Sequence, residues 1–529
     1  MRIAAFVMLL VSALAAPAQE ASFGTQIHVT AIELSAEVVD AAGNTPSDLQ
    51  PSDFVVVEEG VEYPVTAIDY SDLPETRTAN APAPAAADEP KREWRTLIYV
   101  DLELSSRATI RDALASLSAQ AERLVSLGTV DVVVANPAAR QVVSTSDPAA
   151  LVAALKQIAR ITPQDRITHL RRDYLDDDRS RDAITKMRGT APRQLGLPSE
   201  YMRATDVLAK TRTFVEQEQG LIGNLYTRVL RWTARYPRRF PSALMFVSDG
   251  FALDPVAFYG EQMNGAEDAA TLRESLSKRA AAVHEGFARE LAAAGWTFYG
   301  MRGGVTANFG SDVTARNHTS HGGEVIVAGS SEPLQELANA TGGSVESDPR
   351  KFALTIDRMR NRVRFTYQVS RPADGVPRRV EVRARRAGLE VHAPRWAASS
   401  SSDASAAARA GNLLDGLDER GELPVEATFQ VEGDQRKLTS GALAVRASFK
   451  PLAAVLPQLT DATVRVTVAV AIENGPPVVA HKLLRNVNLG KADNISVKVP
   501  LRTNKTKKIV VLVEELSTAV WGGTVVRLQ

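Results

Sequence analysis

Short apolar segments alternate with amphipathic ones through the middle of this chain, and this alternation limits the choice of fold more than any other feature. The predicted strands are 95–100, 130–135, 243–247 and 297–301, and the predicted helices include 110–127, 148–159 and 274–294. Strands that are apolar on both faces belong in a sheet with helices on both sides. We therefore expect a doubly wound α/β domain over residues 93–395.

Two further patterns flank this predicted domain. Residues 22–73 and 423–529 alternate apolar and polar residues in short stretches, and the second region has about seven such stretches over about 100 residues, as in a β-sandwich. A Pro/Ala-rich segment (74–92) and a Ser/Ala-rich segment (396–422) separate the three regions and are expected to be extended linkers. The predicted fold class is a doubly wound α/β domain between two all-β, sandwich-like modules.

Residues 161–213 interrupt the alternation of strands and helices. This segment is rich in Arg and Asp, and a long helical pattern, with Gly220 and Gly223 as a predicted break, follows from 204 to 234. We expect an inserted helical arm. Its charges fit either a solvated helix face or a surface that contacts a partner.

The N-terminus has the pattern of an export signal. Arg2 precedes an uncharged apolar run from Ile3 to Ala16, and Ala16-Pro17-Ala18 provides small residues for cleavage after residue 18. Ala13-Leu14-Ala15 is the other possible cleavage site. The run is shorter than the ~20 residues that a spanning helix needs, and no later segment is long and apolar enough. The sequence therefore predicts a signal peptide (1–18) and a periplasmic or extracellular mature chain without a transmembrane segment.

Composition excludes several classes of function. The chain has no cysteine, which rules out disulfides, thiolate metal sites and thiol catalysis. Lys plus Arg and Asp plus Glu each number 62, so no net charge attracts nucleic acid. A hard oxygen site for Mg²⁺ or Mn²⁺ remains as the plausible metal chemistry.

Two acidic elements follow predicted core strands. Asp101, Glu103 and Ser105 come directly after the first strand, and Asp249 follows the strand at 243–247. In a parallel sheet, the carboxyl ends of neighbouring strands form the edge where ligands bind. We therefore expect these four residues to converge and to offer oxygen ligands to a divalent ion.

Four stretches together resemble von Willebrand factor A-like proteins, and more closely the exported bacterial family of von Willebrand A-related proteins. They are VVDAAGNTPSDLQPSDFVVVEEGVEYPVTAIDY, LIYVDLELSS, RRFPSALMFVSDGF, and LQELANATGGSVESD followed by RMRNRVRFTYQVSRPADGVPRRVEVRAR. The resemblance covers most of residues 26–395. It implies a von Willebrand A (Rossmann-like) fold with a metal-ion-dependent adhesion site. In such a site an Asp-x-Ser-x-Ser loop, a Thr and an Asp hold one divalent ion, and an acidic side chain of a partner fills the remaining coordination position.

The sequence departs from that motif at two places. Asp101, Ser105 and Asp249 match it, but Glu103 stands where the motif has its first Ser. Alignment of the second loop places Asn224 at the Thr position, with Thr227 nearby. Glu103 either ligates the ion itself, which weakens the attraction of the ion for a partner's carboxylate, or occupies the site in the absence of metal.

The resulting functional hypothesis is an exported, non-enzymatic protein that binds another protein through a degenerate adhesion-type site. Two alternatives stay open at this point. One is a metal-dependent hydrolase that uses Asp101, Glu103 and Asp249, and the other is a purely structural envelope protein.

Overall fold

A computed structural model provides the structure of the chain. It describes residues 29–70, 94–176, 199–236, 241–259, 269–302, 331–416, 421–431, 441–455, 461–471, 477–488, 494–501, 508–518 and 520–527. The predicted signal peptide (1–18) and the Pro/Ala segment (74–92) lie outside these residues. No helix among those described combines the length and the apolar character needed to cross a bilayer.

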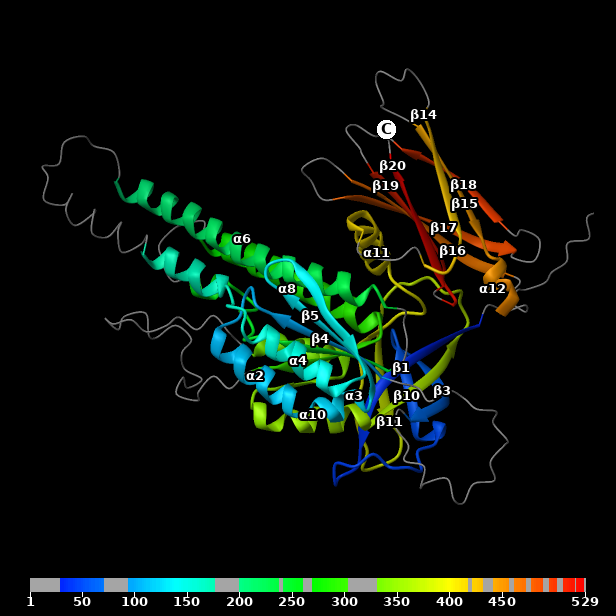
Figure 1. The fold of residues 1–529 in the computed structure, drawn as a ribbon, viewed down its shortest axis with the longest axis horizontal. Helices are drawn as coiled ribbons and strands as arrows, with labels where there is room; N and C mark the ends of the chain where they lie inside the picture. The colour runs from blue at the N-terminus through cyan, green and yellow to red at the C-terminus, as the bar shows by residue number, and fades with distance from the viewer. Residues whose placement is uncertain are drawn as a thin grey trace, which may run out of the picture.

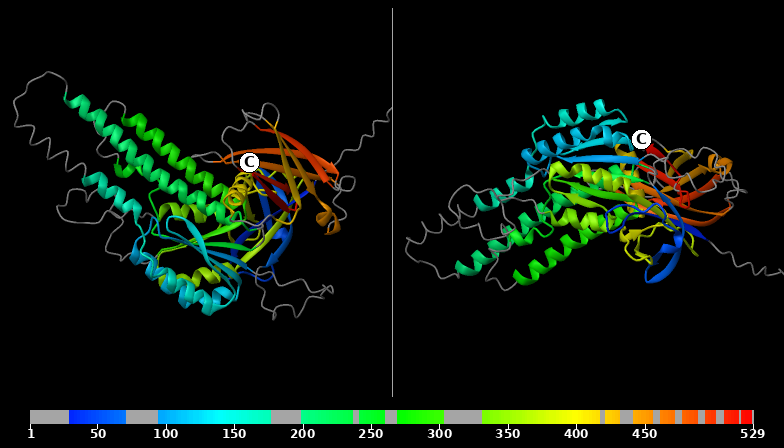
Figure 2. Two further views of the ribbon diagram at one scale, coloured as in Figure 1. Left: turned by 45° about the horizontal axis from the view of Figure 1, so that its top comes forward. Right: turned by 90° about the horizontal axis from the view of Figure 1, so that it is seen from below.

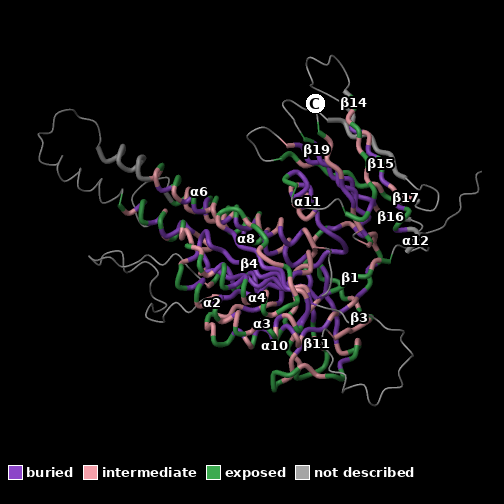
Figure 3. Tube along the Cα trace, in the orientation of Figure 1, coloured by how far each residue is buried: buried purple, intermediate pink, exposed green. Residues whose placement is uncertain are grey.

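A six-stranded sheet lies at the centre of the molecule (Figure 1). Its order is β6 (Ala139–Thr145), β5 (Gly128–Ala135), β4 (Trp94–Asp101), β7 (Ser242–Val247), β8 (Trp296–Met301), β9 (Ser344–Glu346). All neighbours pair in parallel except β5 and β6, which are antiparallel. The four longest parallel strands are almost wholly buried, as Figure 3 shows around β4, because apolar side chains leave both of their faces.

Helices cover both faces of this sheet, and each face has its own apolar core. One core packs α2 (Arg107–Ala119), α3 (Ala121–Val125), α4 (Pro148–Ile158) and α10 (Phe352–Arg360) against the sheet. The other packs α6 (Ser199–Thr233), α8 (Ala269–Ala293) and α9 (Glu332–Thr341). The two views of Figure 2 show these layers.

The long helices α6 and α8 extend past the sheet as an arm (Figure 1). α6 runs for 35 residues without a break at Gly220 or Gly223, contrary to expectation. Residues 166–176 form a further helix beside it, and the buried ion pair between Arg171 and Glu218, with 2.6 Å from Nη2 to Oε1, joins the two. Most of the Arg/Asp-rich segment, residues 177–198, lies outside the described residues.

A second sheet of seven antiparallel strands combines two distant parts of the sequence. Its order is β12 (Glu390–His392), β1 (Thr30–Val39), β10 (Arg362–Val369), β3 (Val61–Tyr70), β2 (Phe54–Glu58), β11 (Arg378–Ala384), β13 (Trp396–Ala397). β10 inserts between β1 and β3, so the N-terminal strands share one core with the strands that follow the central sheet.

The predicted fold class is therefore wrong. The N-terminal strands are not a separate sandwich-like module, because their sheet is completed by β10, β11 and β12, which the sequence assigned to the α/β domain, and by β13, which it assigned to the Ser/Ala segment. The central sheet is also mixed, since its edge strand β6 is antiparallel, so it is not a clear doubly wound parallel sheet. The alternating burial of β10 and β11 is typical of an antiparallel sheet with one solvent-exposed face. It explains why these strands belong to the seven-stranded sheet and not to the central sheet, whose strands are buried on both faces.

The C-terminal region forms two antiparallel sheets around one core of Val, Leu, Ile, Ala and Phe side chains. One sheet has the order β14 (Val425–Val431), β15 (Gly441–Ser448), β18 (Asn494–Leu501). The other has the order β17 (Val478–Asn488), β16 (Asp461–Val470), β19 (Lys508–Glu515), β20 (Trp521–Arg527).

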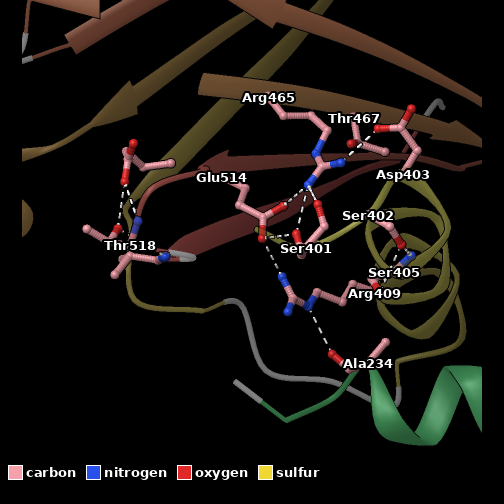
Figure 4. Close-up of polar contacts among 12 residues, drawn as sticks. Ala234, Ser401, Ser402, Asp403, Ser405, Arg409, Arg465, Thr467, Glu514 and Thr518 are labelled. Carbon is pink, nitrogen blue, oxygen red and sulfur yellow. Dashed lines mark hydrogen bonds and ion pairs between the residues drawn. The ribbon is translucent and has the colours of Figure 1, made fainter. Parts of the chain in front are cut away.

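Helix α11 (Asp403–Asp415) joins this region to the rest of the molecule. The sequence suggested an extended linker here, but the Ser402 hydroxyl caps a regular helix by accepting from the Ser405 amide at 3.1 Å. α11 packs between the C-terminal end of α6 and the sheet of β16, β19 and β20. A buried polar network anchored by Arg409, Arg465 and Glu514 holds it there (Figure 4).

Candidate functional site

Asp101 ends β4 and organises the loop that follows. Its Oδ1 accepts hydrogen bonds from the backbone amides of Glu103 and Leu104, each at 3.1 Å. Its Oδ2 accepts the hydroxyl of Ser248 at 3.2 Å. The side chain is completely buried, so its oxygens fix the turn after β4 and face no solvent.

The loop after β7 meets the same turn. Ser105 donates its hydroxyl to Ser248 at 3.3 Å and accepts the amide of Asp249 at 3.2 Å. In return, Asp249 Oδ2 accepts the amide of Ser106 at 2.6 Å. The structure thus brings Asp101, Ser105 and Asp249 together, because β4 and β7 are parallel neighbours that end at the same edge.

Burial dominates the protonation of Asp101. It raises the pKa of this carboxyl to about 6, although hydrogen bonds from Leu104, Glu103 and Ser248 favour the charged form. The negative charge of Glu103 raises the pKa further. The desolvation of a fully buried carboxylate therefore outweighs three hydrogen bonds here.

Glu103 lies in the same turn, with its side chain only 2% exposed, and is held by two arginines. Arg166 Nη1 lies 2.7 Å from Oε1, and Arg228 donates from Nη2 to Oε2. Arg166 begins the helix 166–176 and also donates its amide to the Glu103 carbonyl at 2.9 Å. Arg228 comes from α6. Sequence reasoning missed both arginines, and no motif in the sequence marks them.

Further charged groups surround Asp249. Asp165 has a left-handed backbone (φ 47°), and its pKa is raised by burial and by the charge of Asp249. Arg302 follows β8, and burial lowers its pKa while Asp249 opposes this effect. Among the described residues, Asp249 Oδ1 and Arg302 Nε are buried without a hydrogen-bond partner. The loop cluster, defined as Asp101, Glu103, Ser105, Ser248 and Asp249, thus carries acids and is flanked by guanidinium groups.

The two residues aligned with the second loop of the motif lie elsewhere. Asn224 and Thr227 are exposed on α6, and Thr227 donates its hydroxyl to the Gly223 carbonyl at 2.9 Å. They line a hollow of about 360 Å³ between α6, α8 and residues 252–255. In the described part of the chain, no hydrogen bond joins either side chain to the loop cluster.

Small residues shape this hollow. Gly220 and Gly223 line it, and a Cβ added at either one would meet open space. His284 from α8 is buried on its wall, with Nδ1 2.6 Å from the Tyr226 hydroxyl, and burial lowers its pKa to about 4. Val283 on the rim is 44% exposed. The segment after β7 connects the loop cluster to this hollow: Phe251, two residues after Asp249, packs its ring 5.7 Å from that of Tyr226, which lines the hollow.

Among the described residues, no three His, Cys, Asp or Glu side chains lie close enough together to hold a metal ion. Neither the models of known protein families nor the curated protein sequences give a match to this chain. The resemblance to von Willebrand A-like proteins therefore stays a prediction.

Proposed function

We propose that this chain is an exported, non-enzymatic binding protein that contacts another protein where the loops after β4 and β7 meet α6 and α8. The hollow of about 360 Å³ between α6 and α8 carries this proposal. It lies at the carboxyl-end edge of a largely parallel sheet, where ligands of such sheets bind. Its exposed Val283 gives a partner an apolar anchor point beside a charged loop cluster.

The contacts of the acidic side chains favour binding over catalysis. Asp101 is completely buried and its oxygens accept hydrogen bonds from within the chain. Glu103 is engaged at both oxygens by arginines. A general acid or base needs to reach a reacting proton within hydrogen-bond distance. Neither carboxylate has this access, and the loop cluster contains no histidine among its described residues.

The resemblance to von Willebrand A-like proteins supports the same proposal. Asp101, Ser105 and Asp249 occupy the three positions that match the adhesion motif, and they share one hydrogen-bonded cluster. The family implied by these motifs binds proteins at this edge of its sheet. Export rests on the signal-peptide pattern of residues 1–18.

Substitution on the rim of the hollow tests the proposal. Val283→Asp places a charge on an exposed face of α8. Leu354→Asp does the same on α10, which packs on the opposite face of the sheet and where Leu354 is 52% exposed. Both variants and the unchanged chain are used as baits for quantitative affinity capture from an envelope extract, after circular dichroism shows equal folding. We expect proteins retained by the unchanged chain and by Leu354→Asp to be lost with Val283→Asp. Equal retention by all three baits contradicts the proposal.

A further inference from the structure

We infer that Arg228 and Arg166 take the place of a divalent cation beside Glu103, so that the loop cluster works without metal. This inference concerns the chemistry of the cluster and holds for any partner that binds there. Three observations support it. The charge of Glu103 is compensated by arginines, the oxygens of the cluster already take part in hydrogen bonds, and Arg228 comes from a packed helix.

The charge balance comes first. A buried carboxylate is costly unless a cation and hydrogen bonds compensate it. Glu103 receives one guanidinium at each oxygen, so its charge is compensated from within the chain. A divalent ion entering beside it would be repelled by two positive charges, of which the Arg228 side chain, at 20% exposed, is better shielded from solvent than Arg166 at 47%. Arginine does not lose its proton in proteins, so this repulsion persists at any physiological pH.

The oxygens of the cluster are also already used. Asp101 accepts at both oxygens, and Ser105 and Ser248 are joined to each other and to backbone amides. Mg²⁺ requires near-octahedral oxygen ligands at about 2.0–2.1 Å. In the described cluster, Asp249 Oδ1 is the carboxylate oxygen left without a hydrogen-bond partner. Mg²⁺ keeps several waters in most protein sites but still takes one or two carboxylates, so any ligand beyond Asp249 Oδ1 would have to give up a hydrogen bond that it makes within the cluster.

Arg228 reaches Glu103 from a fixed position. It lies in the last two turns of α6, where Leu225 and Val229 on the same helix are buried against the central sheet. The pair therefore joins helix α6 to the turn after β4, and the Asp101 carboxylate fixes that turn through the amides of Glu103 and Leu104. A Ser at position 103 would need no such cation, whereas Glu103 and Arg228 depend on each other.

Metal titration and a double-mutant cycle test the inference. The full chain is melted with Mg²⁺, with Mn²⁺ and with EDTA, and is titrated with each ion by calorimetry. We expect the same melting temperature in all three conditions and no saturable binding heat. Saturable Mn²⁺ or Mg²⁺ binding that Asp249→Ala abolishes overturns the inference.

The cycle combines Glu103→Gln with Arg228→Met. Arg228→Met leaves a buried carboxylate with one cation and is expected to lower the melting temperature, and adding Glu103→Gln is expected to restore part of that loss. Arg231→Met is the matched control, because Arg231 lies one turn further along α6 and pairs with Asp415 of α11. Glu103→Gln is not expected to restore its loss. Equal behaviour of the two arginine variants, or strict additivity at Glu103 and Arg228, contradicts the inference.

Discussion

Glu514 is the central carboxylate of the network that fixes α11 to the sheet of β16, β19 and β20 (Figure 4). Its Oε1 lies 2.9 Å from Arg409 Nη1, and its Oε2 lies 2.9 Å from Arg465 Nη2. The side chains of Glu514 and Arg465 are 0% exposed, and that of Arg409 is 3% exposed. One buried carboxylate thus compensates two buried guanidinium groups.

Replacement of Glu514 by Gln keeps the shape of the side chain and removes its charge. Breaking a buried ion pair from one side costs about 3–5 kcal/mol, because the remaining charge stays buried without compensation. Two guanidiniums lose their buried carboxylate here, and Arg465 keeps only the exposed Asp403, so we expect Glu514→Gln to lower the free energy of unfolding of the C-terminal region by about 3 kcal/mol.

Asp403→Asn is the matched control. Asp403 binds the same Arg465, with 2.7 Å from Nη1 to Oδ1, but its side chain is 67% exposed. Exposed ion pairs contribute about 0–1 kcal/mol, so this variant is expected to lose no more than that. The comparison separates the effect of burial from the effect of losing one contact to Arg465.

Urea unfolding followed by tryptophan fluorescence measures both variants. Trp521 of β20 lies with its ring 5.5 Å from the Arg409 guanidinium, so its emission reports on this region. The chain has several regions, and each resolved transition is fitted separately. A loss for Glu514→Gln no larger than that for Asp403→Asn would refute the argument that burial makes this network strong.

Three further predictions concern the central region. Burial lowers the pKa of His284 to about 4, so the unfolded chain binds a proton more readily than the folded chain between pH 4 and about 6.5. The free energy of unfolding therefore falls as the pH decreases through this range. Urea unfolding at pH 7 and pH 5 should show a smaller fall for His284→Asn than for the unchanged chain. Asp147 caps α4 through the amides of residues 149 and 150, and Asp147→Ala should cost about 1 kcal/mol in the same assay. A Cβ at Gly343 would lie 1.9 Å from the Phe298 carbonyl oxygen, so Gly343→Ala should lower the melting temperature sharply, whereas Gly286→Ala, which meets open space in α8, should not.

Each of these predictions has a clear contrary result. An unchanged pH dependence for His284→Asn would show that this histidine is protonated equally in both states. An Asp147→Ala variant as stable as the unchanged chain would show that the cap contributes nothing. Equal melting temperatures for the two alanine variants at Gly343 and Gly286 would contradict the close approach of Gly343 to the Phe298 carbonyl of β8.

Hydrophobic periodicity was sufficient to find most of the helices and strands, but not their partners. The predicted strands at 95–100, 130–135, 243–247 and 297–301 all occur in the central sheet. The period of two in β10 and β11 indicates which side chains face a core, but it does not say which strands lie alongside. Their pairing with β1, β3 and β2 joins residues about 300 positions apart in the sequence, as in Val363 with Tyr70.

The candidate site shows the same limit. Asp101, Ser105 and Asp249 were predicted to converge because strand ends in a parallel sheet share an edge, and the structure places them together. Arg166 and Arg228 lie 63 and 125 residues from Glu103, on a short helix and on the arm. No sequence periodicity connects these arginines with Glu103, so the sequence left open how the buried charge of Glu103 is compensated.

The position of α6 connects the two buried charge clusters of the molecule. Arg228 of α6 holds Glu103 in the loop cluster, and Arg231, one turn later, donates to Asn412 of α11 at 3.0 Å. Arg409 of α11 then donates to the carbonyl of Ala234 at 2.9 Å, just beyond the end of α6. A shift of α11 along α6 would have to break these contacts, which are made at the end of α6, within two turns of Arg228. Helix α11 therefore joins the sheet of β16, β19 and β20 to the last turns of α6, from which Arg228 reaches the loop cluster, and none of the described strands is shared between the C-terminal sheets and the central sheet.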